Sequence, residues 1–146
     1  VKKLGAIECF NYKKVDFEEE ILKVTKNQGV NLILDMVAGK YVKKNLHCLK
    51  PDGRLIIIAV QGGPKSEINF AQLMINRQTI SGSTLRPQSD KAKTAYIRSL
   101  KKNVWMLLSK RQIKPIIQKT FSLSKASHAH RALEKGDHVG KFLLKI

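Results

Sequence analysis

Two short segments of the chain are apolar almost throughout and lack the alternation of polar and apolar residues that marks a half-exposed strand. Residues 55–60 read Leu-Ile-Ile-Ile-Ala-Val, and residues 30–35 read Val-Asn-Leu-Ile-Leu-Asp. A strand covered on both faces has this continuous pattern, and such strands occur in parallel sheets with helices on either side. The sequence therefore predicts a parallel sheet inside an α/β fold.

Helix signals alternate with these strands. Asp16 has capping-box spacing with Glu19, and Phe17, Ile21 and Val24 follow on one helical face. Further helices are expected over 40–49, 70–77, 91–110 and 124–135, and further strands over 79–84, 115–121 and 141–146. Alternating helices and strands are typical of a doubly wound parallel sheet.

The longest expected helix, over residues 91–110, carries an apolar stripe. The stripe consists of Tyr96, Ile97, Leu100, Val104, Leu107 and Leu108. Trp105 lies beside this stripe, and we expect it to pack against neighbouring apolar side chains rather than to recognise a ligand.

The composition is that of a globular protein: 42% of the residues are apolar and 27% are charged. With 146 residues, the chain is one domain or part of one, and its start at Val1 rather than Met suggests a fragment. No apolar run approaches the ~18 residues of a membrane span, and no signal-peptide pattern opens the chain. Cys9 and Cys48 form no CxxC motif, which favours a reducing, cytoplasmic setting.

The net charge of +17 is concentrated late in the chain, because residues 91–146 contain 14 Lys or Arg and only 2 Asp or Glu. A basic nucleic-acid-binding module would explain this surplus, and so would lysines on solvated surfaces. Only three of these 14 residues are Arg, and aromatic residues do not interleave with them as base stacking requires. Nucleic-acid binding is therefore kept as an alternative that the sequence does not favour.

The sequence predicts no catalytic and no metal-binding residues. His128 and His130 are two positions apart, so on a helix they point about 200° away from each other and cannot share an ion. His47 and His138 have no partner at ligand spacing. No paired carboxylates and no nucleophile motif are evident either.

The expected carboxyl ends of the strands are candidates for ligand binding, because ligands of doubly wound sheets lie there. These ends are residues 35–39, 60–63 and 83–86, which are rich in small residues. Small residues let a ligand approach the backbone closely, but they are equally common where a strand turns into a helix. The Gly-x-Gly-x-x-Gly turn that holds a pyrophosphate is absent from the sequence.

Several segments, taken together, resemble a known family. They are Leu4-Gly5-Ala6, Asn11-Tyr12-Lys13, Gly29-Val30, residues 34–37, 49–55 and 82–86, and residues 129–134 with 136–141. In this order they resemble the C-terminal half of a medium-chain dehydrogenase/reductase, specifically of the zinc-free, ζ-crystallin-like quinone oxidoreductases. The resemblance covers essentially the whole chain.

The resemblance implies two domains. Residues 1–112 would be the later part of an NADP-binding Rossmann domain, and residues 113–146 would be the strand–helix–strand segment with which the chain returns to the catalytic domain. The first βαβ unit, with its glycine turn, and most of the catalytic domain would belong to an absent N-terminal half. We therefore expect the 146-residue chain alone to be inactive.

The resemblance also implies an NADPH site. Tyr12 would lie near the adenosine ribose and its 2′-phosphate, although it could equally be a half-buried tyrosine at a strand end. Val37 would lie beside the cofactor ribose, and relatives commonly have Gly where this chain has Ala38. The residues expected to position the nicotinamide carboxamide are Val60, Gln61, Gly62, Leu85 and Arg86, and Lys141 is expected near the pyrophosphate.

The activity implied by the resemblance is hydride transfer from NADPH to a quinone or an α,β-unsaturated carbonyl. Such enzymes dimerise through the last Rossmann strand, expected here over 79–84. A methyltransferase that uses S-adenosylmethionine is the alternative, because residues 49–55 also resemble a turn and strand of that class. That alternative requires an antiparallel hairpin after Val60.

Overall fold

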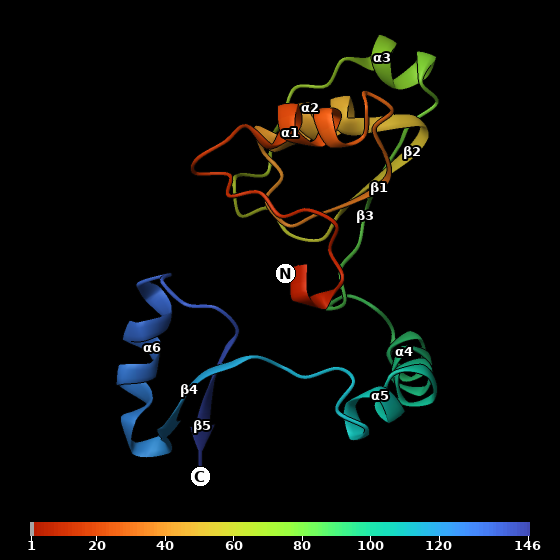
Figure 1. The fold of residues 1–146 in the computed structure, drawn as a ribbon. Coiled ribbons are helices and arrows are strands. Elements are labelled where there is room, and N and C mark those ends of the chain that lie inside the picture. Colours follow the sequence, from red (N-terminus) through yellow and green to blue (C-terminus); the bar gives the residue numbers. More distant parts are fainter. Residues whose placement is uncertain (1) are drawn as a thin grey trace. The chain divides into compact units, whose positions relative to one another are not determined.

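The computed structural model describes residues 2–146, which fold into two compact units. The first unit is Val1–Pro87 and the second is Gln88–Ile146. Both combine helices with parallel strands, which confirms the predicted α/β class (Figure 1). The division at residue 87 follows from packing within each unit, and the expected domain boundary at residue 112 stays a prediction.

The first unit contains a three-stranded sheet in the order β1-β2-β3. Its elements are η1 (Lys2–Leu4), α1 (Phe17–Val24), β1 (Val30–Asp35), α2 (Tyr41–Cys48), β2 (Leu49–Ile57), α3 (Phe70–Ile75) and β3 (Thr79–Gly82). β2 pairs in parallel with both neighbours, as the continuous apolar pattern predicted. A parallel β3 also replaces the antiparallel hairpin that a methyltransferase would need.

The core of this unit lies between α2 and one face of the sheet. Val42 and Leu46 of α2 pack with Leu55 at the centre of β2, and all three are buried. On the opposite face, Leu32 and Leu34 of β1 are 56% and 63% exposed within the described structure. The expected burial of both faces is therefore met on only one of them.

The Pro-Asp-Gly turn signal at 51–53 does not precede the second strand, as expected, but lies within it. β2 starts at Leu49, directly after α2, and the pairing of β1 with β2 shifts register between Leu49 and Arg54. Asp52 adopts a positive φ of 63° and donates its amide to the Asn76 carbonyl at 2.9 Å. The turn residues thus form a bulge, and the strand ends at Ile57 instead of residue 60.

The second unit ends in the predicted strand–helix–strand arrangement. Its elements are α4 (Asp90–Asn103), α5 (Trp105–Ser109), β4 (Ile117–Ser122), η2 (Leu123–Lys125), α6 (Ala126–Glu134) and β5 (Lys141–Lys145). β4 pairs in parallel with β5, and Phe121 and Phe142 pack edge to face with ring centroids 5.8 Å apart.

The helix expected over 91–110 is interrupted. Val104 has a φ of −118°, and its carbonyl accepts bonds from both Leu107 and Leu108, so the chain tightens between α4 and α5. The apolar stripe of α4 is exposed, and so is Trp105, at 59%. Trp105 nevertheless lines one pocket with Ile97 and Lys101 of α4, and the expectation that it packs rather than recognises a ligand stays a prediction. Within residues 2–146, no helix is long and apolar enough to cross a membrane.

Candidate cofactor site

The loops that follow β1 and β2 are joined by backbone hydrogen bonds at the carboxyl ends of these strands. Ile58 donates to the Asp35 carbonyl at 2.8 Å, and Gly62 donates to the Val37 carbonyl at 2.6 Å. Gln61 donates to Met36 at 3.2 Å. Four of the predicted site residues, Val37, Val60, Gln61 and Gly62, therefore lie in one connected pair of loops.

The Asp35 side chain shapes the first of these loops. Its carboxylate is buried, accepts amide bonds from Val37 at 2.6 Å and Ala38 at 3.1 Å, and accepts a third from the Asn45 side chain at 2.9 Å. These bonds fold the chain back at the end of β1 and fasten it to α2. Asp35 thus positions the loop.

The same loop contains two successive residues with left-handed backbone. Ala38 has a φ of 56° and Gly39 a φ of 53°. A Cβ atom on Gly39 would overlap the Gly62 carbonyl oxygen, so only glycine fits there. The positive φ of Ala38 gives a physical reason why relatives would have glycine at that position, and alanine adopts the same conformation here.

The third strand places Leu85 and Arg86 further along the same edge. Ser83 donates its amide to Ile57 at 3.0 Å, so the chain leaves β3 beside the end of β2. Leu85 and Arg86 follow this point and are exposed. Because the sheet order is β1-β2-β3, Val37, residues 60–62 and Leu85 with Arg86 follow one another along this edge.

Tyr12 lies in a pocket of about 420 Å³ close to the start of α2. The pocket is formed by Tyr12, Lys13, Lys14, Val15, Asp16 and Phe17 with Lys40, Tyr41 and Lys44. Four lysines and a single carboxylate make it strongly cationic, and two tyrosines and a phenylalanine supply flat apolar surface. We call this cavity the Tyr12 pocket.

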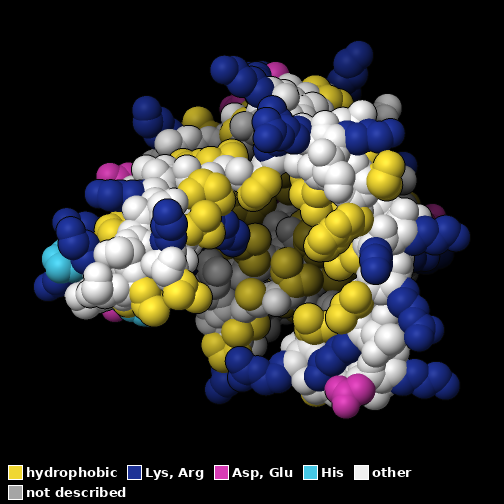
Figure 2. Space-filling view, turned by 90° about the horizontal axis from the view of Figure 1, so that it is seen from below, with side chains coloured by type: hydrophobic (Ala, Val, Ile, Leu, Met, Phe, Trp, Pro, Cys, Tyr) yellow, Lys and Arg dark blue, Asp and Glu magenta, His cyan; other side chains and the backbone are white. Residues whose placement is uncertain are grey.

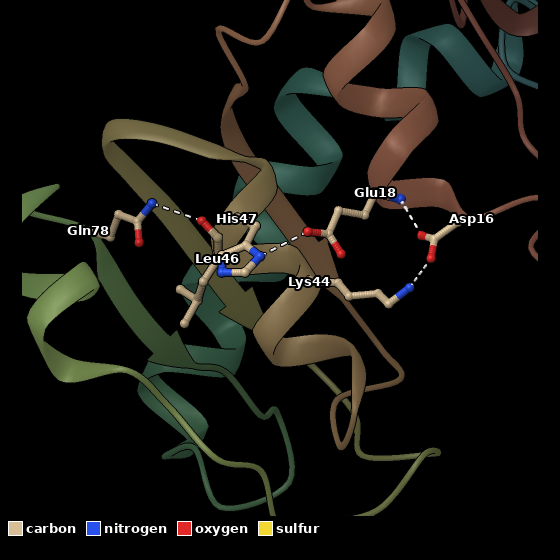
Figure 3. Close-up of polar contacts among 6 residues, drawn as sticks. All are labelled: Asp16, Glu18, Lys44, Leu46, His47 and Gln78. Carbon is tan, nitrogen blue, oxygen red and sulfur yellow. Dashed lines mark hydrogen bonds and ion pairs between the residues drawn. The ribbon is translucent and has the colours of Figure 1, made fainter.

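Asp16 provides the single carboxylate of the Tyr12 pocket. Its carboxylate caps α1 by accepting the Glu18 amide at 3.0 Å, and it pairs with the Lys44 ammonium (Figure 3). The Lys44 and Glu18 bonds lower the pKa of Asp16, and the bond with Asp16 raises the pKa of Lys44. The expected capping box is only half formed, because within residues 2–146 the Glu19 carboxylate accepts no hydrogen bond from the Asp16 amide. The neighbouring Glu18 carboxylate contacts the His47 ring at 2.9 Å.

The other three lysines of the Tyr12 pocket are electrostatically uncompensated. Lys13, Lys14 and Lys40 form no ion pair within residues 2–146. Phe17 and Tyr41 pack with ring centroids 5.1 Å apart and hold α1 against α2 beside these lysines. The pocket can therefore accept a flat ring together with a multiply charged anion.

Lys141 belongs to the second unit, where it is the first residue of β5 and donates its amide to Ile116 at 2.8 Å. Its side chain is exposed.

No three His, Cys, Asp or Glu residues among those described lie close enough together to hold a metal. Lys and Arg side chains dominate the charged groups on the face shown in Figure 2.

The sequence reasoning missed Lys40, Tyr41 and Lys44 as members of the candidate site. The available signal was that Lys40 directly follows Ala38-Gly39 at the carboxyl end of β1. Lys44 is one helical turn further on, so it shares a face of α2 with Lys40. Only the folding of residues 12–17 against this face reveals the cavity.

This α/β fold with parallel strands is shared with solved dehydrogenases. Over 99% of its length it superposes on 39% of a solved NAD-dependent alcohol dehydrogenase, with a TM-score of 0.76 and 25% identity. More specifically, the chain belongs to the zinc-binding dehydrogenase family, which matches residues 4–144. This match confirms the resemblance to medium-chain dehydrogenase/reductases.

Two relatives illustrate the range of the family. Human quinone oxidoreductase is 28% identical over 146 residues, which cover 97% of this chain and 42% of that protein. A highly reducing polyketide synthase of Didymella fabae is 25% identical over 139 residues, covering 92% of this chain and 7% of the synthase. The chain thus spans less than half the length of the quinone oxidoreductase.

Proposed function

We propose that this chain forms the later part of the nicotinamide-cofactor domain of an NADPH-dependent quinone oxidoreductase. On this proposal, residues 113–146 belong to the catalytic domain of the whole protein. The family and the 28% identity to human quinone oxidoreductase support an oxidoreductase. The proposal adds two points to this: NADPH is the preferred cofactor, and a quinone is the substrate.

The observation that carries the proposal is the Tyr12 pocket at the start of α2. Its uncompensated lysines suit the phosphate on the 2′ position of NADPH, and the rings of Tyr12 and Tyr41 suit the adenine. Tyr12 is 63% exposed on the pocket wall, which leaves its ring and hydroxyl accessible. The donors and the flat surfaces of the cavity therefore fit the adenosine end of the cofactor.

The remaining contacts would follow the edge of the sheet away from the Tyr12 pocket. The ribose would lie beside Val37, and the backbone of residues 60–62 and of Leu85 and Arg86 would orient the nicotinamide. Exposed Lys141 has the charge to contact the pyrophosphate. When bound, NADPH would supply the hydride, and the protein would hold the ring and limit the access of water.

We also propose that the whole protein dimerises through β3. This strand is last in the sheet order, and its outer edge has no partner strand within residues 2–146. An unpaired strand edge is a template for another strand, and pairing of two β3 strands would satisfy its amides and carbonyls. The strand comprises Thr79–Gly82, two residues shorter than expected.

A titration tests the cofactor proposal. NADPH, NADH and S-adenosylmethionine are added separately to the 146-residue chain, and binding is followed by nicotinamide fluorescence and by calorimetry. We expect NADPH to bind more tightly than NADH, and Tyr12→Ala to weaken both. Preferential binding of S-adenosylmethionine would instead support the methyltransferase alternative. Steeply salt-dependent binding of DNA would support the nucleic-acid alternative.

A further inference from the structure

Lys40 and Lys44 lie one turn apart on the same face of α2, and both line the Tyr12 pocket. They differ in their electrostatic surroundings. Lys44 is paired with Asp16, whereas Lys40 has no ion pair within residues 2–146. The two lysines are thus a natural comparison between a neutralised cation and a free one in a single cavity.

The Asp16–Lys44 pair is held in place from both sides. Asp16 is fixed by its cap bond to the Glu18 amide, and the Lys44 ammonium also lies 5.8 Å from the centre of the Phe17 ring. The Glu18–His47 contact adds a second polar link between α1 and α2. Lys44 is therefore directed toward α1 instead of toward a ligand.

Lys40 occupies a different position. It is exposed at the N-terminal end of α2 and follows Gly39, whose backbone lies against Gly62. That contact fixes the origin of its side chain at the edge of the sheet. The bond from Lys44 lowers the pKa of Asp16, which keeps this carboxylate ionised at neutral pH. Lys40 therefore differs from Lys44 in having no ion pair within residues 2–146.

We infer that Lys40 is one of the cations that select a 2′-phosphorylated adenine nucleotide, and that Asp16 limits this selectivity by neutralising Lys44. This inference rests on the proposed cofactor site. A carboxylate in the pocket repels a phosphate dianion, and its pairing with Lys44 removes one of the four lysines from recognition. The preference for NADPH over NADH is thus adjustable in both directions within the pocket.

The experiment compares the ratio of NADPH to NADH affinity across four variants of the 146-residue chain. Lys40→Gln removes the free cation, and we expect the ratio to fall about tenfold, as for loss of a hydrogen bond to a charged group. Asp16→Asn releases Lys44 while asparagine still caps α1, and we expect the ratio to rise about threefold or more. NADH affinity should change less than about twofold in both variants, because NADH lacks the 2′-phosphate.

A double-mutant cycle separates the charge of Lys44 from its packing. Lys44→Gln leaves Asp16 uncompensated and should lower the ratio, whereas Asp16→Asn with Lys44→Gln removes a neutral pair and should restore it close to wild type. Circular dichroism and thermal unfolding establish that each variant is folded. Lys40→Gln, at an exposed position, keeps the test informative if a variant of Asp16 unfolds.

The possible failures can be told apart. If the unsubstituted chain binds neither nucleotide, the proposed cofactor site and this inference both fail. If NADPH is preferred but neither Lys40→Gln nor Asp16→Asn changes the ratio, the cofactor site stands and the inference is wrong. A lowered ratio in Asp16→Asn would also contradict the inference.

Discussion

Gly39 and Gly62 meet backbone to backbone where the loops after β1 and β2 cross, and no side chain fits between them. The Gly62 amide, in turn, donates to the Val37 carbonyl at 2.6 Å. This contact sets how closely the two loops approach, and it places Val37 and the residues around Gly62 in one surface. The whole candidate site along this edge depends on it.

Gly39→Ala should therefore destabilise the first unit by about 1–3 kcal/mol, since the new Cβ overlaps the Gly62 carbonyl oxygen and the loops must move apart. The positive φ of Gly39 adds strain of its own for an alanine, as it does at Ala38, so the loss combines the overlap with the backbone conformation. Urea unfolding followed by circular dichroism measures the loss. Gly136→Ala is the matched control, because Gly136 has a φ of 68° and an added Cβ there has no atom within 4 Å, and an equal loss there would exclude the overlap as a cause.

Gln78→Leu should lower the free energy of unfolding by about 1–3 kcal/mol. The buried amide of Gln78 donates to the Leu46 carbonyl at 2.9 Å (Figure 3). It also donates to the Leu49 carbonyl at 3.1 Å, where α2 ends and β2 begins. Leucine has a similar volume but leaves both carbonyls without this donor. The exposed Gln112→Leu is the control, and a stability equal to wild type in both variants would show that the Gln78 bonds contribute nothing.

The two cysteine thiols should differ in reactivity. Cys48 is fully buried, and burial raises its pKa to about 11, whereas Cys9 is exposed. The nucleophilic form is the thiolate, so a thiol reagent at about pH 8 should label Cys9 rapidly and Cys48 only after unfolding. Mass spectrometry of the labelled peptides checks this, and equally rapid labelling of Cys48 in the folded chain would refute it.

The same burial makes stability depend on alkaline pH. The folded chain keeps the Cys48 proton up to about pH 11, whereas the unfolded thiol loses it near its ordinary pKa of 9.0. Because the folded state then binds more protons, this thiol contributes a loss of stability of at most about 1.4 kcal/mol per pH unit as pH rises between these values. Cys48→Ala should flatten the fall in stability measured by urea unfolding from about pH 8 to about pH 10. If stability falls with pH equally steeply in Cys48→Ala, Cys48 is not the cause of the fall.

Gly82→Pro should weaken the proposed dimer. Ser83 donates its amide to Ile57 in β2, so strand alternation directs the Gly82 amide toward the outer edge of β3, where proline would remove it. Sedimentation velocity should show more monomer than for Gly82→Ala, which keeps the amide. A chain that is monomeric before any substitution would disprove the proposal for these 146 residues.

The 146-residue chain should not oxidise NADPH steadily when a quinone is supplied. It contains no Gly-x-Gly-x-x-Gly turn, and it corresponds to 42% of the length of human quinone oxidoreductase. The nicotinamide absorbance of NADPH checks this, with the human enzyme as the positive control. Sustained turnover by the purified chain would overturn the expectation.

The amino-acid sequence by itself determined the class of the fold. Continuous apolar segments at 30–35 and 55–60 required a sheet with parallel neighbours, and the helical repeat after Asp16 required an amphipathic helix. These signals are local, because the period of the apolar residues depends only on the backbone geometry of one element. The order of the elements then restricted the topology.

The tertiary structure decided the outcome where two local signals conflicted. It also decided which residues far apart in the sequence come into contact. The turn signal at 51–53 became a bulge because pairing with β1 continued on both sides of it. The link between Asp16 and Lys44, 28 positions apart, and the cavity around Tyr12 depend on how α1 lies against α2. No periodicity encodes such contacts, because they form only once burial of the shared core has fixed the distance between the two helices.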